Sequence, residues 1–266
     1  MHTPHAVIEA SGLGKVFARN GRAVTALDGI DFSVQEGSFV SLVGPSGCGK
    51  STLLSIVAGL APPTSGKVLI DGSPITGPMP GKVAVVFQDA LLLPWRSALS
   101  NVELPLEVRG ESAGMRREKA RAMLALVGLV DAAERYPHEL SGGMRQRVAI
   151  ARGLVQDPQI VLMDEPFGAL DEQTRTRMGD ELLRIWEAAQ KTVLFVTHSL
   201  TEALYLSDRV FVMGRNPGRI IETVTVDMLR PRHIEMIGSA KFGSARNHIW
   251  RLIGQDADPS QSAGNG

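Results

Sequence analysis

The chain has 266 residues, and its 28 Lys and Arg balance 28 Asp and Glu, so its formal net charge is zero. This balance argues against a nucleic-acid surface as the dominant feature of the protein. The length is sufficient for one α/β domain with an inserted or appended part and a large core. The single cysteine, Cys48, excludes an internal disulfide and suits a reducing cytoplasm.

Neither a signal peptide nor a membrane helix is expected. Residues 2–10 lack a basic stretch followed by a long apolar run. No apolar run approaches the roughly 18 residues that a membrane helix needs. We therefore expect a soluble protein, for which any role at a membrane would depend on a partner.

The N-terminal part of the chain is predicted to be rich in β-structure. Residues 6–10, Ala-Val-Ile-Glu-Ala, read as a strand, and residues 30–34 alternate between apolar and polar side chains, which predicts two strands with a hairpin near Gly21 between them. Phe17 stands alone among polar residues. It has two interpretations, an ordinary core aromatic or a platform for a nucleotide base.

Residues 44–51 read Gly-Pro-Ser-Gly-Cys-Gly-Lys-Ser and match the phosphate-binding loop pattern G-x-x-x-x-G-K-[ST]. An apolar strand over 38–43 precedes the loop and an apolar helix from Leu53 follows it, which is the context the motif needs. Glycines let successive N–H groups turn toward an anion, and the helix N-terminus adds partial positive charge. A Gly-rich turn before a helix is the alternative, but the context favours binding of a nucleoside triphosphate.

The middle of the chain, over residues 90–157, is predicted to be a mostly helical insertion. A strand over 82–87 runs into Gln88, and the apolar cluster 91–95 follows, which is either buried core or a docking surface. Helical spacing over 115–129 is followed by a second helix that begins at Ser141, a good N-cap.

Residues 160–165 predict a buried strand that ends in two carboxylates, Asp164 and Glu165. Adjacent strand residues point to opposite sides, so the two carboxylates are expected to have different roles. Asp164 would hold Mg²⁺, and Glu165 would orient and deprotonate an attacking water. A solvent-facing acidic strand end is the alternative.

The second half continues to alternate helices and strands. A strand over 192–197 ends at His198, which is either structural or a group for polar chemistry. A helix over 200–207, a strand over 210–213 and a turn at 216–218 follow. The polar residues from Gln255 onward predict disorder.

Leu-Ser-Gly-Gly-Met-Arg-Gln-Arg at 140–147 closely resembles the LSGGQ signature of ATP-binding-cassette (ABC) ATPases. Further matches to this family appear in its order between residues 6 and 226. They are the aromatic Phe17, the phosphate loop 44–52, the Q-loop residue Gln88, the second NTPase motif Asp164-Glu165, the D-loop Ala169-Leu170-Asp171 and the switch histidine His198. Two departures are Met144 in place of the usual Gln and Ser199 in place of the common Asp.

The resemblance implies an α/β fold, with a P-loop NTPase (RecA-like) core, an N-terminal antiparallel β subdomain and an inserted helical subdomain. The core with the β subdomain would span 1–89 and 158–226, the helical subdomain 90–157, and a C-terminal extension 227–266.

The resemblance also implies a role for each matching residue. The catalytic residues would be Glu165, His198 and Gln88. The ATP-binding residues would be Phe17, Gly44, Pro45, Ser46, Gly47, Cys48, Gly49, Lys50, Ser51 and Thr52. The contacts to the ATP of a second copy would come from Ser141, Gly142, Gly143 and Asp171. The Mg²⁺ ligands would be Ser51, Gln88 and Asp164, and the residues that dock a partner would be Leu93 and Trp95.

The implied ligands are ATP and Mg²⁺, and the implied assembly is a head-to-tail homodimer with ATP at its interface. The implied partners are integral-membrane permease subunits and, indirectly, a substrate-binding protein, with no nucleic acid. The implied location is peripheral, on the cytoplasmic face of the inner membrane.

Several segments of the sequence resemble those of the nitrate/sulfonate/taurine importer group. They are residues 92–95, 141–147, 192–198, 205–209 and 217–220. This similarity implies ATP-driven import of a small anion-type solute, which the binding protein selects and this chain does not encode. A cassette that drives export or lipid movement shares every catalytic residue and stays open as an alternative.

Other classes fit less well. Soluble cassette ATPases of DNA repair or translation carry a long coiled-coil insertion or two cassettes, which do not fit in 266 residues. A small P-loop GTPase is disfavoured because an Asn-Lys-x-Asp guanine-reading motif is missing, and a small P-loop kinase is disfavoured because it has no use for the segment at 140–147. A separate hypothesis is that alkylation of Cys48 blocks ATP binding; the alternative is a small residue tolerated in the loop.

Overall fold

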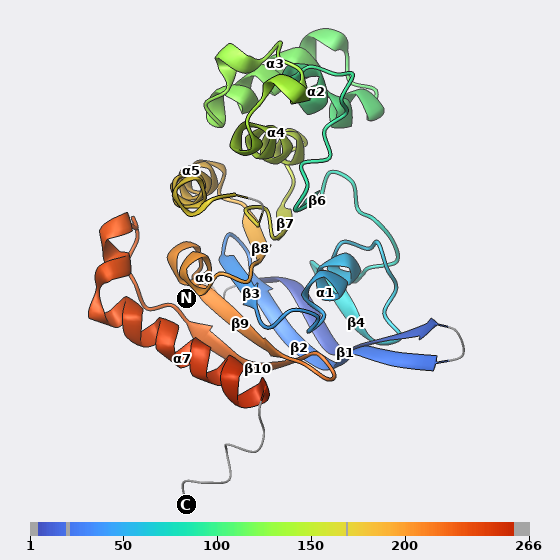
Figure 1. Ribbon diagram of the computed structural model, residues 1–266. Coiled ribbons are helices and arrows are strands. Elements are labelled where there is room, and N and C mark those ends of the chain that lie inside the picture. The colour runs from blue at the N-terminus through green and yellow to red at the C-terminus, as the bar shows by residue number, and fades with distance from the viewer. Residues whose placement is uncertain (1–4, 20–21, 169, 258–266) are drawn as a thin grey trace, which may run out of the picture. The chain divides into compact units, whose positions relative to one another are not determined.

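The structure is a computed structural model that describes residues 5–19, 22–168 and 170–257 (Figure 1). It divides into two compact units, one formed by residues 1–79 with 192–266 and the other by residues 80–191. The second unit is larger than the helical insertion predicted over 90–157, because it also contains the strands and the long helix that flank that insertion. Each unit is described by itself.

The N-terminal strands of the first unit form an antiparallel sheet in the order β2-β1-β4-β5. The strands are β1 (Ala6–Arg19), β2 (Arg22–Gln35), β4 (Ser65–Ile70) and β5 (Ser73–Pro74). The predicted pairing of residues 6–10 with 30–34 is confirmed, and both strands are longer than predicted. Gly21, predicted to lie in the hairpin turn, is outside the described residues.

A second sheet carries the core of this unit, in the order β10-β9-β3-β8. Its strands are β3 (Phe39–Val43), β8 (Thr192–Val196), β9 (Arg209–Gly214) and β10 (Arg219–Thr225). Strand β3 is parallel to β8 and β9, and β10 is antiparallel to β9. Every residue of β3 and β8 is buried, as their continuous apolar runs predict for parallel strands.

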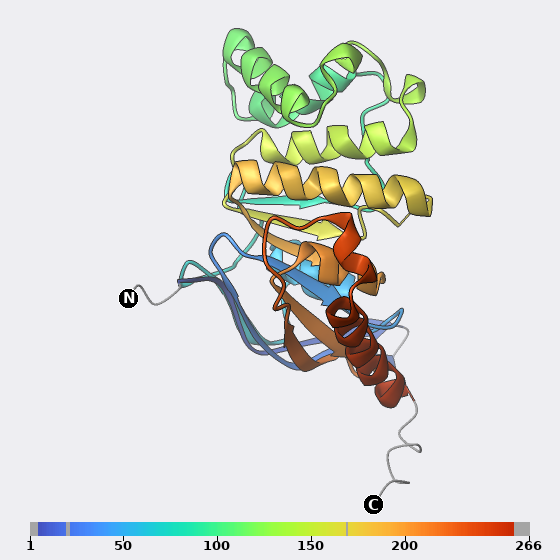
Figure 2. The same ribbon diagram turned by 90° about the vertical axis from the view of Figure 1, so that its left-hand side faces the viewer.

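Helices complete the first unit. They are α1 (Lys50–Val57), α6 (Leu200–Leu206), the 3₁₀ helix η3 (Ile234–Gly238) and α7 (Ala240–Ala257). Helix α7 packs beside β9, β10 and α6 (Figures 1 and 2). The prediction of disorder from Gln255 onward is wrong for the residues up to Ala257, because the buried side chains of Phe242 and Ile249 anchor this helix on the unit.

The second unit is mainly helical around two parallel strands, β6 (Val83–Val86) and β7 (Ile160–Asp164). Its helices are α2 (Ala98–Val108), α3 (Ala113–Leu126), η1 (Val130–Ala132), η2 (Pro137–Glu139), α4 (Gly142–Leu154) and α5 (Glu172–Ala189). Helices α4 and α5 run side by side (Figure 2). Among the helices of the described ranges, none has the length and apolar character needed to cross a membrane.

Candidate nucleotide-binding site

The phosphate loop joins strand β3 to helix α1, as predicted. The strand ends at Val43, and the helix begins at Lys50 after the N-cap residue Gly49. Gly49 has a φ of 93°, and a Cβ at this position would lie 3.0 Å from the carbonyl oxygen of Ala26, so the turn requires glycine. The first N–H groups of an α-helix lack intrahelical acceptors, so the start of α1 is suited to an anion.

The Lys50 side chain lies within this loop. It is 6% exposed, and its Nζ donates hydrogen bonds to the carbonyl oxygens of Gly44 at 2.9 Å and Pro45 at 3.2 Å. Ser46 and Ser51 are exposed beside it. A positive charge is therefore held against a backbone that turns at glycines, which is the chemistry that binds phosphate.

His198 emerges at the same sheet edge as the phosphate loop. In the parallel pairing of β3 with β8, Leu42 lies opposite Val196, and Gly44 and His198 each follow two residues later. Ser199, which departs from the family pattern, caps α6 by accepting a hydrogen bond from the N–H of Glu202 at 3.3 Å. The first unit thus brings the loop and the predicted switch histidine together at the carboxyl ends of its parallel strands.

Phe17 lies on strand β1 and is 46% exposed, with the Lys15 ammonium 5.2 Å from its ring centroid. The interpretation of Phe17 as a core aromatic is therefore wrong. An exposed ring beside a cation is compatible with stacking against a base, and that role stays a prediction.

The second unit brings Gln88 to the segment that contains both predicted carboxylates. Val86 of β6 pairs with Met163 of β7, so Gln88, two residues after β6, and Asp164, the last residue of β7, lie at the same edge. A Cβ on Gly168 would lie 3.0 Å from the Gln88 Nε2, and the Gly168 N–H donates to the Glu165 carbonyl oxygen at 3.0 Å. The Gln88 amide therefore lies against the loop that follows β7.

Glu165 does not continue strand β7, which ends at Asp164. Its φ is 44°, in the left-handed region that side-chain-bearing residues rarely occupy. The expectation that Glu165 continues strand β7 is therefore wrong, and strand alternation does not determine where its side chain points relative to Asp164. A local turn sets the direction of Glu165, and such strained backbone is enriched at functional sites.

The signature motif and the D-loop segment meet within the second unit. Ser141 caps α4, its Oγ accepting from the Met144 N–H at 3.3 Å, and Asp171 caps α5, its Oδ1 accepting from the Thr174 N–H at 3.0 Å. A Cβ on Gly143 would lie 3.4 Å from the Thr174 Cγ2. Hydrogen bonds from Thr174, through its side chain and then its backbone, lower the pKa of the Asp171 carboxyl. Ala169, also assigned to this D-loop, is outside the described residues.

The apolar segment after Gln88 is an ordered loop. The Asn101 side chain is fully buried; its Nδ2 donates to the carbonyl oxygens of Leu93, Arg96 and Ser97 at 3.2, 2.9 and 3.0 Å. Its Oδ1 accepts from the Leu93 N–H at 2.8 Å. Leu91 is 59% exposed and Trp95 is 70% exposed, so the core interpretation is wrong for these two residues.

Helix α4 supports the same segment through two side chains that sequence reasoning missed. Arg152 donates to the carbonyl oxygens of Leu91 at 2.8 Å and Ala90 at 2.7 Å, and Gln146 donates to that of Phe87 at 3.2 Å. The helix that opens with the signature motif therefore holds the backbone on both sides of Gln88. Gln146 lies in the signature phrase, whereas no sequence pattern pointed to Arg152 or Asn101.

Cys48 is 1% exposed, and burial raises the pKa of its thiol, although the nearby Lys50 opposes the shift. Because the thiolate is the reactive form, we expect iodoacetamide to modify Cys48 at least about tenfold more slowly at pH 8 than it modifies glutathione. Mass spectrometry of the intact chain measures this rate without ambiguity, since no other cysteine exists. A rate equal to that of glutathione would show that the loop exposes the thiol.

The comparisons with known proteins agree with this geometry. A family model described as ABC transporter matches residues 27–168. An uncharacterized ABC transporter ATP-binding protein of Methanocaldococcus jannaschii is 53% identical over 225 residues, 85% of this chain and 84% of that protein. A taurine import ATP-binding protein of Rhizobium johnstonii is 48% identical over 253 residues, 92% of this chain and 95% of that protein.

Among solved structures, a dimeric ATP-binding cassette in a post-hydrolysis state, bound to ADP and Pi, superposes with a TM-score of 0.72. It is 33% identical in sequence, and the match covers 84% of this chain and 100% of the chain in that structure. The chain belongs to the ABC transporter family and is one of its ATPase cassettes.

Proposed function

We propose that the chain is the ATP-hydrolysing subunit of a membrane importer for a small anion-type solute of the nitrate, sulfonate and taurine kind. The observation that carries this proposal is the 48% identity to a taurine import protein, which covers 92% of this chain and therefore extends beyond the catalytic motifs. Catalytic motifs are shared by importers and exporters alike, so similarity over nearly the whole length favours import over export.

In this proposal Lys50 and the backbone of residues 44–49 bind the β- and γ-phosphates of ATP, and Phe17 stacks against its base. Glu165 orients and deprotonates the attacking water, His198 contacts the γ-phosphate, and Gln88 senses the water. The support within the first unit is the common sheet edge of the loop and His198. The support within the second unit is the contact of Gln88 with the Glu165 loop.

Magnesium fits the proposed ligands. Ser51, Gln88 and Asp164 offer only oxygen donors toward a cation, which Mg²⁺ prefers, and Mg²⁺ is commonly held by one or two carboxylates together with substrate phosphates. When bound, it would neutralise developing charge on the β- and γ-phosphates. Ser51 at the start of α1 and Asp164 at the end of β7 are the residues that would hold it.

Two copies would close on ATP head to tail, with residues 141–143 of each copy facing the γ-phosphate held by the other. These residues open helix α4, so they supply N–H donors and the positive end of the helix dipole. Asp171 at the start of the neighbouring α5 would join them. ATP would thereby hold the dimer together, and its hydrolysis would weaken the interface. The dimeric form of the related cassette supports this assembly.

A matched pair of serine caps tests the role of the signature motif. Ser141 and Ser97 cap α4 and α2, and each accepts a backbone hydrogen bond at 3.3 Å. Replacing either by Ala is expected to lower the free energy of unfolding by about 1 kcal/mol. Only Ser141→Ala is expected to reduce ATP-induced dimerisation, by at least about tenfold, because only this hydroxyl faces the ATP of the other copy.

Analytical ultracentrifugation in a Glu165→Gln background measures this dimerisation, and thermal unfolding of each variant verifies the matched loss of stability. Equal dimerisation of the Ser141→Ala and Ser97→Ala variants would exclude the proposed contact. The closed dimer would then have to form through other surfaces.

The proposed link to the membrane is the loop that carries Leu93 and Trp95. It would bind a short cytoplasmic helix of a permease subunit, which places this chain peripherally on the cytoplasmic face of the inner membrane. Support comes from the 70% exposure of Trp95 on a backbone that the buried Asn101 holds. Large aromatic side chains on rigid backbone make strong anchors for partners. A separate binding protein would select the solute.

A further inference from the structure

The face of α7 that meets the first unit ends in a carboxylate. Phe242, Ile249 and Asp256 follow one another at intervals of seven residues, or about two helical turns. Phe242 and Ile249 are fully buried, and the Asp256 side chain is only 6% exposed. A buried carboxylate needs partners to offset its desolvation, so the groups around Asp256 indicate what it does.

Asp256 joins the two sides of the turn between β9 and β10. Its Oδ2 accepts a hydrogen bond from the Arg215 N–H at 2.8 Å, and its Oδ1 accepts one from the Arg219 guanidinium at 2.6 Å. The carboxylate also lies directly on the backbone of Gly214, where a Cβ would be 2.7 Å from each of its oxygens. The end of α7 therefore fixes residues 214–219 from outside the sheet.

The end of β9 and the turn that follows it both lie against the phosphate loop. A Cβ on Gly44 would lie 2.6 Å from the Met213 carbonyl oxygen, and a Cβ on Gly218 would overlap the carbonyl oxygen of Cys48. Gly218 is also tied to β2, because its N–H donates to the Ala26 carbonyl oxygen at 3.1 Å. Strand β9 thus contacts the loop at Gly44 through Met213, and the turn contacts it at Cys48 through Gly218, with no room for a side chain at either contact.

We propose that Asp256 is a positioning residue for the phosphate loop. By closing the turn between β9 and β10, its carboxylate holds Gly218 against Cys48 and holds the end of β9, next to Met213, against Gly44, so the loop N–H groups keep the geometry that binds phosphate. The C-terminal extension thereby contributes to ATP affinity without touching ATP. This role concerns nucleotide binding by the chain alone and does not depend on the identity of the solute or permease.

The sole cysteine provides a local reporter of this contact. Asp256→Ala removes a carboxylate that accepts two hydrogen bonds, so it is expected to raise the dissociation constant for a fluorescent ATP analogue by at least about tenfold. The rate of Cys48 alkylation is expected to rise as well, in part because the Asp256 charge raises the pKa of the Cys48 thiol, so the positional effect is read from the Gly214→Ala variant described below, which keeps that charge. The kcat of the full chain is expected to stay within about twofold, because Asp256 contacts none of the reacting groups. The measurements are made well below the melting temperature of every variant.

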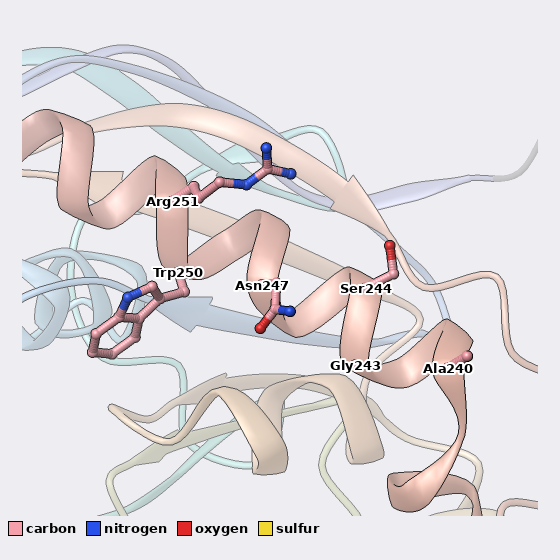
Figure 3. A pocket seen from close by; sticks show the side chains of 6 residues that line it. All are labelled: Ala240, Gly243, Ser244, Asn247, Trp250 and Arg251. Atoms are coloured by element: carbon pink, nitrogen blue, oxygen red, sulfur yellow. The ribbon is translucent and has the colours of Figure 1, made fainter.

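Two controls separate positioning from general loss of stability. Lys241 lies at the opposite end of α7 from Asp256 and forms an exposed ion pair with Asp227, with 2.7 Å between Nζ and Oδ2. Lys241→Ala breaks this pair and is expected to change neither the Cys48 alkylation rate nor the ATP affinity. Asn247→Ala removes a side chain from the open hollow on another face of the helix and is likewise expected to have no effect. Figure 3 shows the residues that line this hollow, Ala240, Gly243, Ser244, Asn247, Trp250 and Arg251.

A second variant displaces the carboxylate without removing it. The Cβ of Gly214→Ala would collide with the Asp256 carboxylate, so this variant is expected to raise both readouts, and adding Asp256→Ala is expected to produce little further change in ATP affinity. If Asp256→Ala fails to fold, Gly214→Ala and Arg219→Gln carry the test. Unchanged Cys48 reactivity and ATP affinity in the folded variants, or equal changes in the Lys241→Ala control, would overturn the proposal.

Discussion

Glu165→Gln is expected to lower steady-state ATP hydrolysis by at least about 100-fold, the lower range for loss of a general base. Gln keeps the size and hydrogen-bonding reach of Glu but cannot accept a proton. The backbone at this position is fixed independently of the side chain, because the Glu165 carbonyl oxygen accepts from the Gly168 N–H at 3.0 Å. ATP binding should therefore be retained, and the ATP-bound dimer should accumulate.

Phosphate release and equilibrium binding of a fluorescent ATP analogue measure the two parts of this prediction. Glu187→Gln is a matched control, since Glu187 is exposed near the C-terminal end of α5, away from Asp171 and the other residues assigned to ATP. Its hydrolysis should stay within about twofold of the parent, as is usual for exposed substitutions away from the reacting groups. Rapid hydrolysis by Glu165→Gln would remove Glu165 from the role of general base.

Trp95→Ala is expected to reduce ATP-dependent transport at least about tenfold while the isolated chain hydrolyses ATP normally. A truncated aromatic anchor typically costs an interface that much or more. Trp95 is 70% exposed, and Asn101 holds the loop backbone around it through the Leu93, Arg96 and Ser97 carbonyl oxygens. Removal of the indole should therefore leave the fold and the nucleotide site intact.

Trp250→Ala is the matched control for this experiment, because Trp250 on α7 is likewise 70% exposed. Uptake of solute into vesicles that contain the complete transporter reports coupling, and phosphate release from the purified chain reports basal hydrolysis. Loss of both activities in Trp95→Ala would contradict a docking role, and so would an equal loss of transport in Trp250→Ala.

The phosphate loop could be predicted because its chemistry depends on neighbours in sequence. The spacing of glycines before Lys50 determines the turn, and the apolar runs on either side determine the strand and the helix. The N-cap at Ser141 was predictable for the same reason, since a cap and its acceptor lie within one helical turn.

Other features depend on partners that are distant in sequence. Asp256 lies in a polar stretch whose composition predicts disorder, yet its hydrogen-bond partner Arg219 lies 37 residues away in the chain. Arg152 holds the backbone of Leu91 from 61 residues away. Local composition cannot predict these contacts, because the fold determines which buried polar groups meet.

Glu165 illustrates a different limit of sequence reasoning. The apolar run before it predicts a strand, and strand alternation then predicts the direction of its side chain. The strand instead ends one residue earlier, and the φ of 44° at Glu165 turns the chain in a way that no residue preference for Glu would suggest. Strained conformations of this kind are imposed by surrounding structure.

Affinity purification of tagged Glu165→Gln from its own membranes in the presence of ATP would test whether this cassette energises a transporter. We expect a polytopic permease to copurify, and we expect Trp95→Ala in the same background to release it. The permease and its binding protein would then identify the solute for uptake assays. Recovery of only soluble or nucleic-acid partners, at every detergent condition, would contradict the importer function.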